Sequence, residues 1–291
     1  MMVRIGIALL GALGRLPLPL LRGLGAFIGR VLFVLAAGRR KVALRNLELC
    51  FPDMPESERK VLARQSFEVF CQTFLDRGWL WAGSEALVRS RVKLVGALQE
   101  LDGDTPTIVF APHFYSMDAG GLALPLNTQR EFTSIFATHP DPVQDAWFMA
   151  GRQRFGNVRM LNRADGVKPI LSTLRKGGLL YLLPDMDYGP NDSVFVPFFA
   201  VPEVATIPSL SRFARLGRAK VVALYSRMTP DGYVAELTPA WDHFPTDDHV
   251  ADTARMNREL EAAIRTMPSQ YYWVHRRFKT RPEGQPSVYR K

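Results

Sequence analysis

The stretch TIVFAPHFYSMDAGG, residues 107–121, changes the pattern of the sequence from helical to strand-like. It opens with a short apolar run, TIVFA, of the kind that forms a buried strand. His113 follows this run by two residues, and Asp118 follows His113 by five. Ser116 is a residue type that caps helices, so we expect Asp118 in the first turn of a helix, where the helix dipole favours a carboxylate. The stretch therefore predicts a strand, a turn that carries a histidine, and a helix.

The same alternation continues along the chain. Four further apolar runs are expected to form strands, at residues 132–137, 158–161, 179–183 and 220–226. Helical patterns separate them at residues 143–154, 167–176 and 207–216. Strands that alternate with helices predict an α/β fold with a mostly parallel central sheet and helices on both faces.

The length of 291 residues and a hydrophobic fraction of 47% allow one large core plus an accessory segment. We expect residues 1–38 to form an N-terminal helical membrane-binding extension and residues 39–291 to form the main domain. Within it, residues 39–100 are a helical lead-in and residues 105–282 the α/β part. The two cysteines, Cys50 and Cys71, occur outside any Cys-x-x-Cys pattern and are expected to be free thiols.

Positive charge is concentrated at the two ends of the chain. Residues 1–50 carry eight Lys or Arg against Glu48, and residues 270–291 carry six against Glu283, whereas the whole chain has a formal charge of +9. A basic rim around a near-neutral body fits an anionic membrane surface or a phosphorylated lipid, and we expect no nucleic acid partner. Basic ends that only aid solubility are the alternative.

Residues 1–38 are apolar except for four arginines, Arg4, Arg15, Arg22 and Arg30. No uncharged run exceeds about ten residues, whereas a simple membrane span needs roughly 20. Pro17 and Pro19 break the helix, so a helical segment lying in the membrane interface is expected. A secretory signal fits less well, because the basic group at residues 39–41 follows at once and favours a cytoplasmic location for the rest. A buried hairpin is the other alternative and would need partners for its arginines.

Polar residues follow several of the expected strands, and in such sheets the working residues gather at the carboxyl ends of strands. These residues are His113, His139, Arg163, Asp185 and Asp187. A reaction that takes the proton from a hydroxyl group needs a base for that proton and an acid that orients the imidazole. His113 as base and Asp118 as its partner satisfy this need without a protein nucleophile, a metal or a cofactor. A histidine with a purely structural role is the alternative.

Arg163 presents a planar fork of donors, which suits a phosphate or the oxygen charge that develops on a thioester carbonyl. A structural ion pair with Asp185 or Asp187 is the alternative for Arg163. The two aspartates are candidates for substrate binding. A metal site formed by them lacks a third ligand nearby in the sequence.

Further candidates for substrate binding lie in the last third of the chain. Phe198 and Phe199 are expected either to line an acyl tunnel or simply to pack in the core. Thr206 is expected to open the helix that follows it, where it caps the helix or binds an oxyanion. A cluster near the end mixes cations with aromatic residues and suits a phosphorylated head group at an interface, unless it is an ordinary edge strand; its polar members are His275, Arg276 and Arg277.

Together with four further blocks, residues 111–121 resemble the lipid A biosynthesis acyltransferases, a family of the wider glycerolipid acyltransferase group. The other blocks are residues 45–59, 161–189, 194–209 and 269–282, so that the resemblance covers nearly the whole chain. It implies transfer of a secondary acyl chain from acyl carrier protein to a hydroxyl of the lipid A precursor Kdo-lipid IVA. It also implies a location at the cytoplasmic face of the inner membrane.

Two positions depart from the family pattern. Asp118 stands where many members have Glu, and Ala200 stands where Gly commonly follows the two phenylalanines. Three other functions remain possible from the residues alone. A serine hydrolase would need a Gly-x-Ser-x-Gly elbow, which the sequence lacks. A nonenzymatic lipid-binding protein gives no reason for His113, Asp118 and Arg163 to converge. An acyltransferase for glycerophospholipids or phosphatidylinositol mannosides would share the same chemistry.

Overall fold

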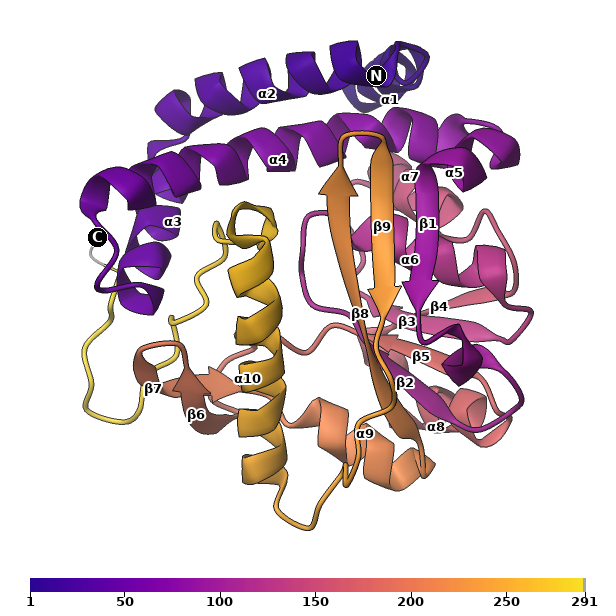
Figure 1. Ribbon diagram of the computed structural model, residues 1–291, viewed down its shortest axis with the longest axis vertical. Coiled ribbons are helices and arrows are strands. Elements are labelled where there is room, and N and C mark those ends of the chain that lie inside the picture. Colours follow the sequence, from indigo (N-terminus) through magenta and orange to yellow (C-terminus); the bar gives the residue numbers. More distant parts are fainter. Residues whose placement is uncertain (290–291) are drawn as a thin grey trace.

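A mixed sheet lies at the centre of the protein (Figure 1). The computed structural model describes residues 1–289, and within them seven strands form this sheet in the order β1-β9-β8-β2-β5-β3-β4. The strands are β1 (Val92–Gly96), β2 (Thr107–Phe110), β3 (Phe132–Phe136), β4 (Val158–Asn162), β5 (Leu179–Leu182), β8 (Lys220–Thr229) and β9 (Gly232–Leu237). The five strands from β8 to β4 are parallel, whereas β9 runs antiparallel to β8 and pairs in parallel with β1.

Helices cover both faces of the sheet, and a separate antiparallel hairpin joins β6 (Val194–Phe198) to β7 (Val201–Thr206). The helices are α1 (Met2–Leu13), α2 (Leu18–Leu35), α3 (Ala37–Cys50), α4 (Glu56–Ala82), α5 (Glu85–Arg91), α6 (Met117–Asn127), α7 (Pro142–Arg152), α8 (Val167–Arg175), α9 (Ser209–Gly217) and α10 (His249–Thr266). The expected α/β fold with a mostly parallel sheet is confirmed. The sequence patterns did not reveal β1, β9, the β6–β7 hairpin or α10.

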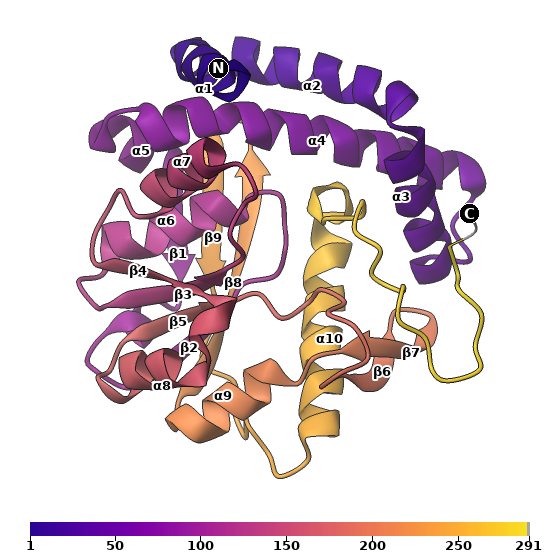
Figure 2. The same cartoon turned by 180° about the vertical axis from the view of Figure 1, so that it is seen from behind.

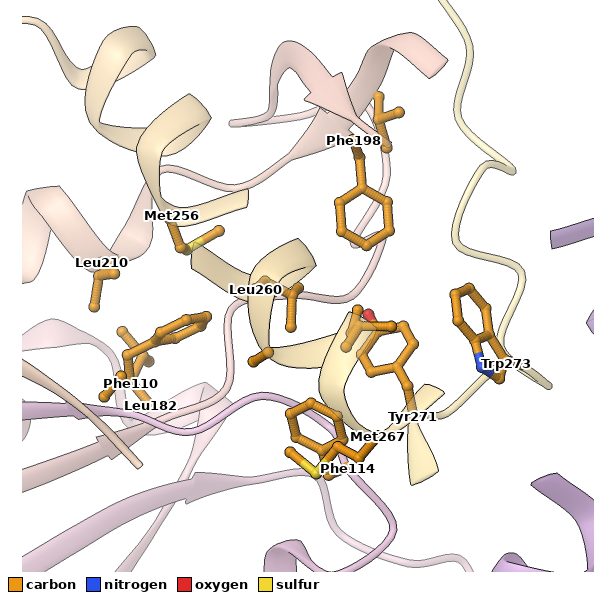
Figure 3. Packing of buried hydrophobic residues seen from close by; sticks show 14 of the residues in the cluster. Phe110, Phe114, Leu182, Phe198, Leu210, Met256, Leu260, Met267, Tyr271 and Trp273 are labelled. Carbon is orange, nitrogen blue, oxygen red and sulfur yellow. The ribbon is translucent and has the colours of Figure 1, made fainter. Parts of the chain in front are cut away.

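Successive residues of the central strands point to opposite faces, so the strands contribute to two cores. Phe110 of β2 and Leu182 of β5 pack with α8, α9 and α10 on one face. Val109 and Tyr181, their neighbours in the chain, pack with α6 on the other. Figure 3 shows part of the first core, in which the aromatic rings of the carboxyl-terminal segment lie close to Phe114, just beyond β2. The loops that follow β2 and β5 are therefore fixed between packed layers.

The N-terminal hairpin, α1 and α2, lies along α4 on the side away from the sheet (Figures 1 and 2). The break between α1 and α2 occurs near the expected prolines, and Arg15 lies in the turn between the two helices. Contact with α4 is close, because a Cβ at Gly29 would lie 2.5 Å from Glu68 Cα. Glycines at such positions let two helix backbones approach.

Arg22 of α2 is buried and donates to the Asp76 carboxylate of α4 at 2.9 and 3.1 Å. It also donates to backbone carbonyl groups in the β8–β9 turn, among them that of Gly232 at 3.0 Å. The inner face of the hairpin is therefore tied to the main domain by a paired charge. By length and composition, α2 is the one helix of residues 1–289 that is apolar enough to cross a membrane.

Candidate active site

His113 and Asp185 are brought together by the register of two neighbouring parallel strands. Phe110 of β2 pairs with Leu182 of β5, and each is the last residue of its strand. His113 and Asp185 each follow these residues by three positions. Since parallel strands end at the same edge of a sheet, both side chains leave the sheet at the same point.

The His113 imidazole donates through Nδ1 to Asp185 Oδ1 at 2.7 Å, because an ionised carboxylate can only accept. The His113 backbone N–H donates to Asp185 Oδ2 at 3.0 Å. Asp185 is fully buried, and burial alone would raise its pKa, but the charge and hydrogen bonds of His113 outweigh burial and hold that pKa below its usual value. This arrangement fixes the Nδ1–H tautomer and leaves Nε2 as the basic nitrogen.

A carboxyl-terminal segment, residues 270–275, holds both members of this pair. Tyr271 Oη donates to Asp185 Oδ2 at 3.1 Å. Tyr271 also forms an antiparallel bridge with Phe114, in which Tyr115 N donates to Gln270 O at 2.9 Å. Burial among neighbours that include Asp185 raises the pKa of Tyr271 well above its usual value, so the hydroxyl keeps its proton and remains a donor.

Asp118 lies in the first turn of α6, as expected, but its carboxylate pairs with two arginines rather than with His113. Arg77 of α4 donates to Asp118 Oδ2 at 2.7 and 2.9 Å, and Arg152 of α7 donates to Oδ1 at 3.2 Å. Burial would raise the Asp118 pKa, but the two guanidinium groups outweigh it and lower that pKa. Ser116 precedes the helix but donates to the Ser226 carbonyl instead of capping it. The partner expected for His113 is therefore replaced by Asp185 in this structure.

Two cavities meet at His113. The first, here called the large cavity, has a volume of about 580 Å³ and mostly apolar walls from α6, β3, α8 and α9. The second, here called the small cavity, has a volume of about 400 Å³ and lies between α4, the loops after β2 and β5, and residues 272–275. His113, Met117 and Tyr188 line both cavities. The imidazole thus stands where two substrates can meet.

Several other expected site residues also line these cavities. Asp118 and Arg163 line the large cavity, and the Arg163 guanidinium stacks on the Tyr188 ring at 4.3 Å instead of pairing with an aspartate. Asp187 and His275 line the small cavity. Asp187 accepts from Thr280 N and Oγ1, both at 2.8 Å, and its own N–H donates to His275 Nε2 at 3.2 Å. Burial, with Arg277 and His113 nearby, lowers the His275 pKa to about 4, so this ring is neutral at pH 7.

The remaining expected residues lie outside the walls of both cavities. Phe198 is fully buried against Phe278, and Phe199 packs on Trp273. Arg277 is buried and donates to Ala205 O and to Thr206 Oγ1, both at 2.7 Å. Thr206 ends β7 rather than opening a helix, because α9 begins at Ser209, and Arg276 is exposed beside Tyr289. The structure therefore does not bring these residues to His113.

Sequence reasoning missed several residues that the geometry brings to the site, among them Tyr271, which donates to Asp185. Arg77 and Arg152 hold Asp118, and Tyr272 and Tyr188 line the small cavity. Arg77 gave no signal, because it lies 41 residues before Asp118 in a segment that reads only as a helix. Tyr272 lies within residues 269–282, the last block of the resemblance, but no local sequence pattern shows that this segment packs beside the loops after β2 and β5.

A histidine held by a buried carboxylate at the carboxyl ends of parallel strands, beside a mostly apolar cavity, is an arrangement suited to general-base chemistry on a lipid-like substrate. The family model described as "Bacterial lipid A biosynthesis acyltransferase" matches residues 1–280. The chain belongs to this family and is an O-acyltransferase.

Three relatives from Escherichia coli K12 illustrate the similarity. The "Lipid A biosynthesis lauroyltransferase" is 33% identical over 98% of this chain and 94% of its own length. The "Lipid A biosynthesis palmitoleoyltransferase" is 32% identical over 98% of this chain and 93% of its own. The "Lipid A biosynthesis myristoyltransferase" is 33% identical over 94% of this chain and 84% of its own. The three names differ in the acyl chain, so family membership does not fix chain length.

Proposed function

We propose that this enzyme transfers a secondary fatty acyl chain from acyl carrier protein to a hydroxyl of a lipid A precursor. The observation that carries the proposal is the free Nε2 of His113 at the junction of two cavities, with Nδ1 held by buried Asp185. A hydroxyl substrate and a thioester substrate can then meet at one base. The apolar walls of the large cavity support a fatty acyl donor.

In the proposed reaction, His113 Nε2 takes the proton of the acceptor hydroxyl while the hydroxyl oxygen attacks the carbonyl carbon of the thioester. The carbon–sulfur bond then breaks, and the imidazolium returns the proton to the leaving sulfur, which yields an ester and a free thiol. Asp185 positions the imidazole and stabilises its positive charge. Arg163, at the rim of the large cavity, is proposed to bind a phosphate or the developing oxyanion.

Asp118 has a different proposed task from the one expected from its spacing. By holding Arg77 and Arg152, its carboxylate joins α4, whose Arg77 lines the small cavity, to α7, whose Arg152 lines the large cavity. The guanidinium of Arg77 also lies over the rings of Trp81 and Phe148, at 5.1 and 5.6 Å. The catalytic role of Asp118 is therefore proposed to be indirect, because its carboxylate positions Arg77 and Arg152, which line the small and the large cavity.

The location at the membrane is a further part of the proposal. The N-terminal hairpin presents an outer apolar face, with Leu20 63% exposed and Phe27 62% exposed. We propose that this face enters the cytoplasmic leaflet of the inner membrane, where an anionic surface also attracts the basic ends of the chain. The donor carrier protein then approaches from the cytoplasm.

The test uses purified enzyme, a panel of acyl carrier protein thioesters, Kdo-lipid IVA as acceptor, and mass analysis of the product. Wild-type enzyme should add one acyl chain. His113→Ala should lower the rate by about 10²- to 10⁴-fold, because it removes the base. Asp185→Asn, which keeps the shape of the side chain, should have a comparable effect, and the double variant should be little worse than His113→Ala.

Asp118→Ala serves as the comparison in this series. Its effect should multiply with that of His113→Ala, since its carboxylate acts through Arg77 and Arg152. Arg163→Lys should lower transfer with folding retained, because the bidentate fork is lost. If Asp118 rather than Asp185 proves non-additive with His113, the pairing in this structure is not the one used in catalysis. Absence of acyl transfer by wild-type enzyme contradicts the proposed function itself.

A further inference from the structure

The two cavities that meet at His113 differ in their walls and in their positions relative to the N-terminal hairpin. Helix α4 forms one wall of the small cavity, with the side chains of Phe70, Thr73 and Arg77. The hairpin packs on a different side of the same helix, at Glu68, Gln72 and Gly78. The small cavity is therefore separated from the apolar hairpin by a single helix.

The large cavity extends away from the hairpin. Its walls include Ile170 of α8 and Phe213 of α9, two helices at the opposite end of the molecule from α1 and α2 in both views (Figures 1 and 2). Between these helices and His113, the walls are formed largely by apolar side chains of β3 and α6, such as Leu122 and Ile135. Such a long apolar space suits a single acyl chain better than a sugar.

The small cavity is more polar where it approaches His113. Tyr272 and His275 contribute hydrogen-bonding groups. Since the His275 pKa is lowered to about 4, this ring is a neutral hydrogen-bonding group at pH 7 and not a cation. Its Nε2 accepts from Asp187 N, so its Nδ1 carries the proton and can donate to a hydroxyl. Aromatic rings of Phe70 and Tyr115, 5.6 Å apart, provide an apolar floor.

We infer that the small cavity binds the hydroxyl-bearing acyl chain of the acceptor lipid and that the large cavity binds the acyl chain of the thioester donor. This assignment rests on the proposed function and adds to it the site of each substrate. An acceptor that remains in the membrane reaches the nearer, α4-walled cavity, whereas a donor on a soluble carrier reaches the cavity that extends to α8 and α9. The acceptor hydroxyl and the thioester carbonyl then approach His113 Nε2 from two sides.

Two substitutions that reduce one cavity at a time test the assignment. A Cβ at Gly121 of α6 would meet only Tyr181, at 3.9 Å, so Gly121→Leu places its remaining atoms in the large cavity without a backbone clash. Thr73→Phe enlarges a side chain in the wall of the small cavity. Matched controls are Gly121→Ala and Thr73→Ser, which change the same positions with little or no added volume and keep a hydroxyl at position 73.

Steady-state kinetics with a series of saturated acyl carrier thioesters and with Kdo-lipid IVA separate the two substrates. Gly121→Leu should shift the preferred donor to chains about two carbons shorter, because a close-packed pocket does not accommodate the added atoms. Thr73→Phe should raise the acceptor KM roughly tenfold or more and leave the order of donor preference unchanged. An exchange of these two phenotypes, or a changed donor order in both variants, would overturn the assignment.

A measurement on wild-type enzyme covers the case in which either substitution prevents folding. An acyl carrier thioester with a diazirine at the end of its chain is bound and irradiated, and the labelled peptides are identified. Labels are expected in α6, β3, α8 or α9, and labelling of α4 at Phe70 or Thr73 would place the donor in the small cavity and contradict the inference. A wild-type enzyme that binds and is labelled by the donor but transfers nothing to Kdo-lipid IVA would contradict the proposed function and not the donor site.

Discussion

Tyr271 connects the carboxyl-terminal segment to His113 through Asp185. Its hydroxyl donates to the same Asp185 oxygen that accepts from the His113 backbone. Its ring packs between Phe114 and Trp273, with centroids 5.8 and 5.1 Å away (Figure 3). Tyr271 is therefore a positioning residue, whose hydroxyl and ring have separable effects.

We predict that Tyr271→Phe keeps the packing and changes the pH dependence of transfer. Without the donated hydrogen bond, the Asp185 carboxylate becomes more basic and stabilises the His113 imidazolium more strongly. The acidic limb of the kcat profile should therefore move up by roughly half to one pH unit. A profile that does not move, in a variant that has merely lost stability, would show that the hydroxyl has only a structural role.

The individual site residues were easier to predict than their pairing. His113 and Asp185 were both identified from their positions after apolar runs, because a polar residue at the end of a buried strand is conspicuous. Their contact depends on β5 lying next to β2, which no local pattern encodes. Asp118 was assigned to His113 because the two are near in sequence, whereas its actual partner Arg77 comes from α4. Ion pairs between distant elements are fixed by packing and not by spacing.

At the scale of elements, the chain order of the strands differs from their spatial order. The connection from β2 to β3 skips one position, and β5 later fills it. The alternation of strands and helices predicted the parallel part of the sheet well, because it is a local property. The edge formed by β9 and β1 was missed, since β1 follows a helical segment and its side chains are half exposed.

The contact of α2 with α4 gives a matched pair of glycines for a test at this scale. A Cβ at Gly29 would lie 2.5 Å from Glu68 Cα, whereas a Cβ at Gly23 of the same helix meets nothing within 4 Å. Gly29→Ala should therefore separate the helices and lower the free energy of unfolding by about 1–3 kcal/mol. Gly23→Ala should raise it by about 0.5–1 kcal/mol, as in an ordinary exposed helix.

Unfolding in detergent, followed by circular dichroism, measures both effects. Equal stabilities of the two variants would indicate that α2 is not packed on α4 in the working enzyme. The ion pair between Arg22 and Asp76 also joins α2 to α4. Deletion of the hairpin would leave the buried Asp76 carboxylate without its guanidinium partner.

At the scale of the whole molecule, the proposed attachment to a membrane depends on how the hairpin would lie against the bilayer. Although α2 is long and apolar enough to span, it lies alongside α4, which carries Arg64 and Glu68. Arg30 of α2 pairs with Glu68 at 3.0 Å. A spanning α2 would draw these charges into the hydrocarbon region at a cost of several kcal/mol. A hairpin that lies flat keeps them at the polar boundary and inserts only its outer face.

We therefore predict that charges on the outer face release the enzyme from membranes without unfolding it. Leu20 and Phe27 lie seven residues apart on one face of α2 and are both more than 60% exposed, so replacing them removes few internal contacts. The double variant Leu20→Glu, Phe27→Glu should bind vesicles containing anionic lipid at least about tenfold more weakly, since each side chain loses roughly 1.5–3 kcal/mol of burial.

Leu98→Glu, at an exposed site beyond β1 at the end remote from the hairpin, is the control and should bind as wild type does. Vesicle flotation at low and high salt measures the binding, and circular dichroism verifies the fold. If the double variant still floats with vesicles at high salt, the enzyme attaches through another surface, and the acceptor would then not reach His113 from the side of α4.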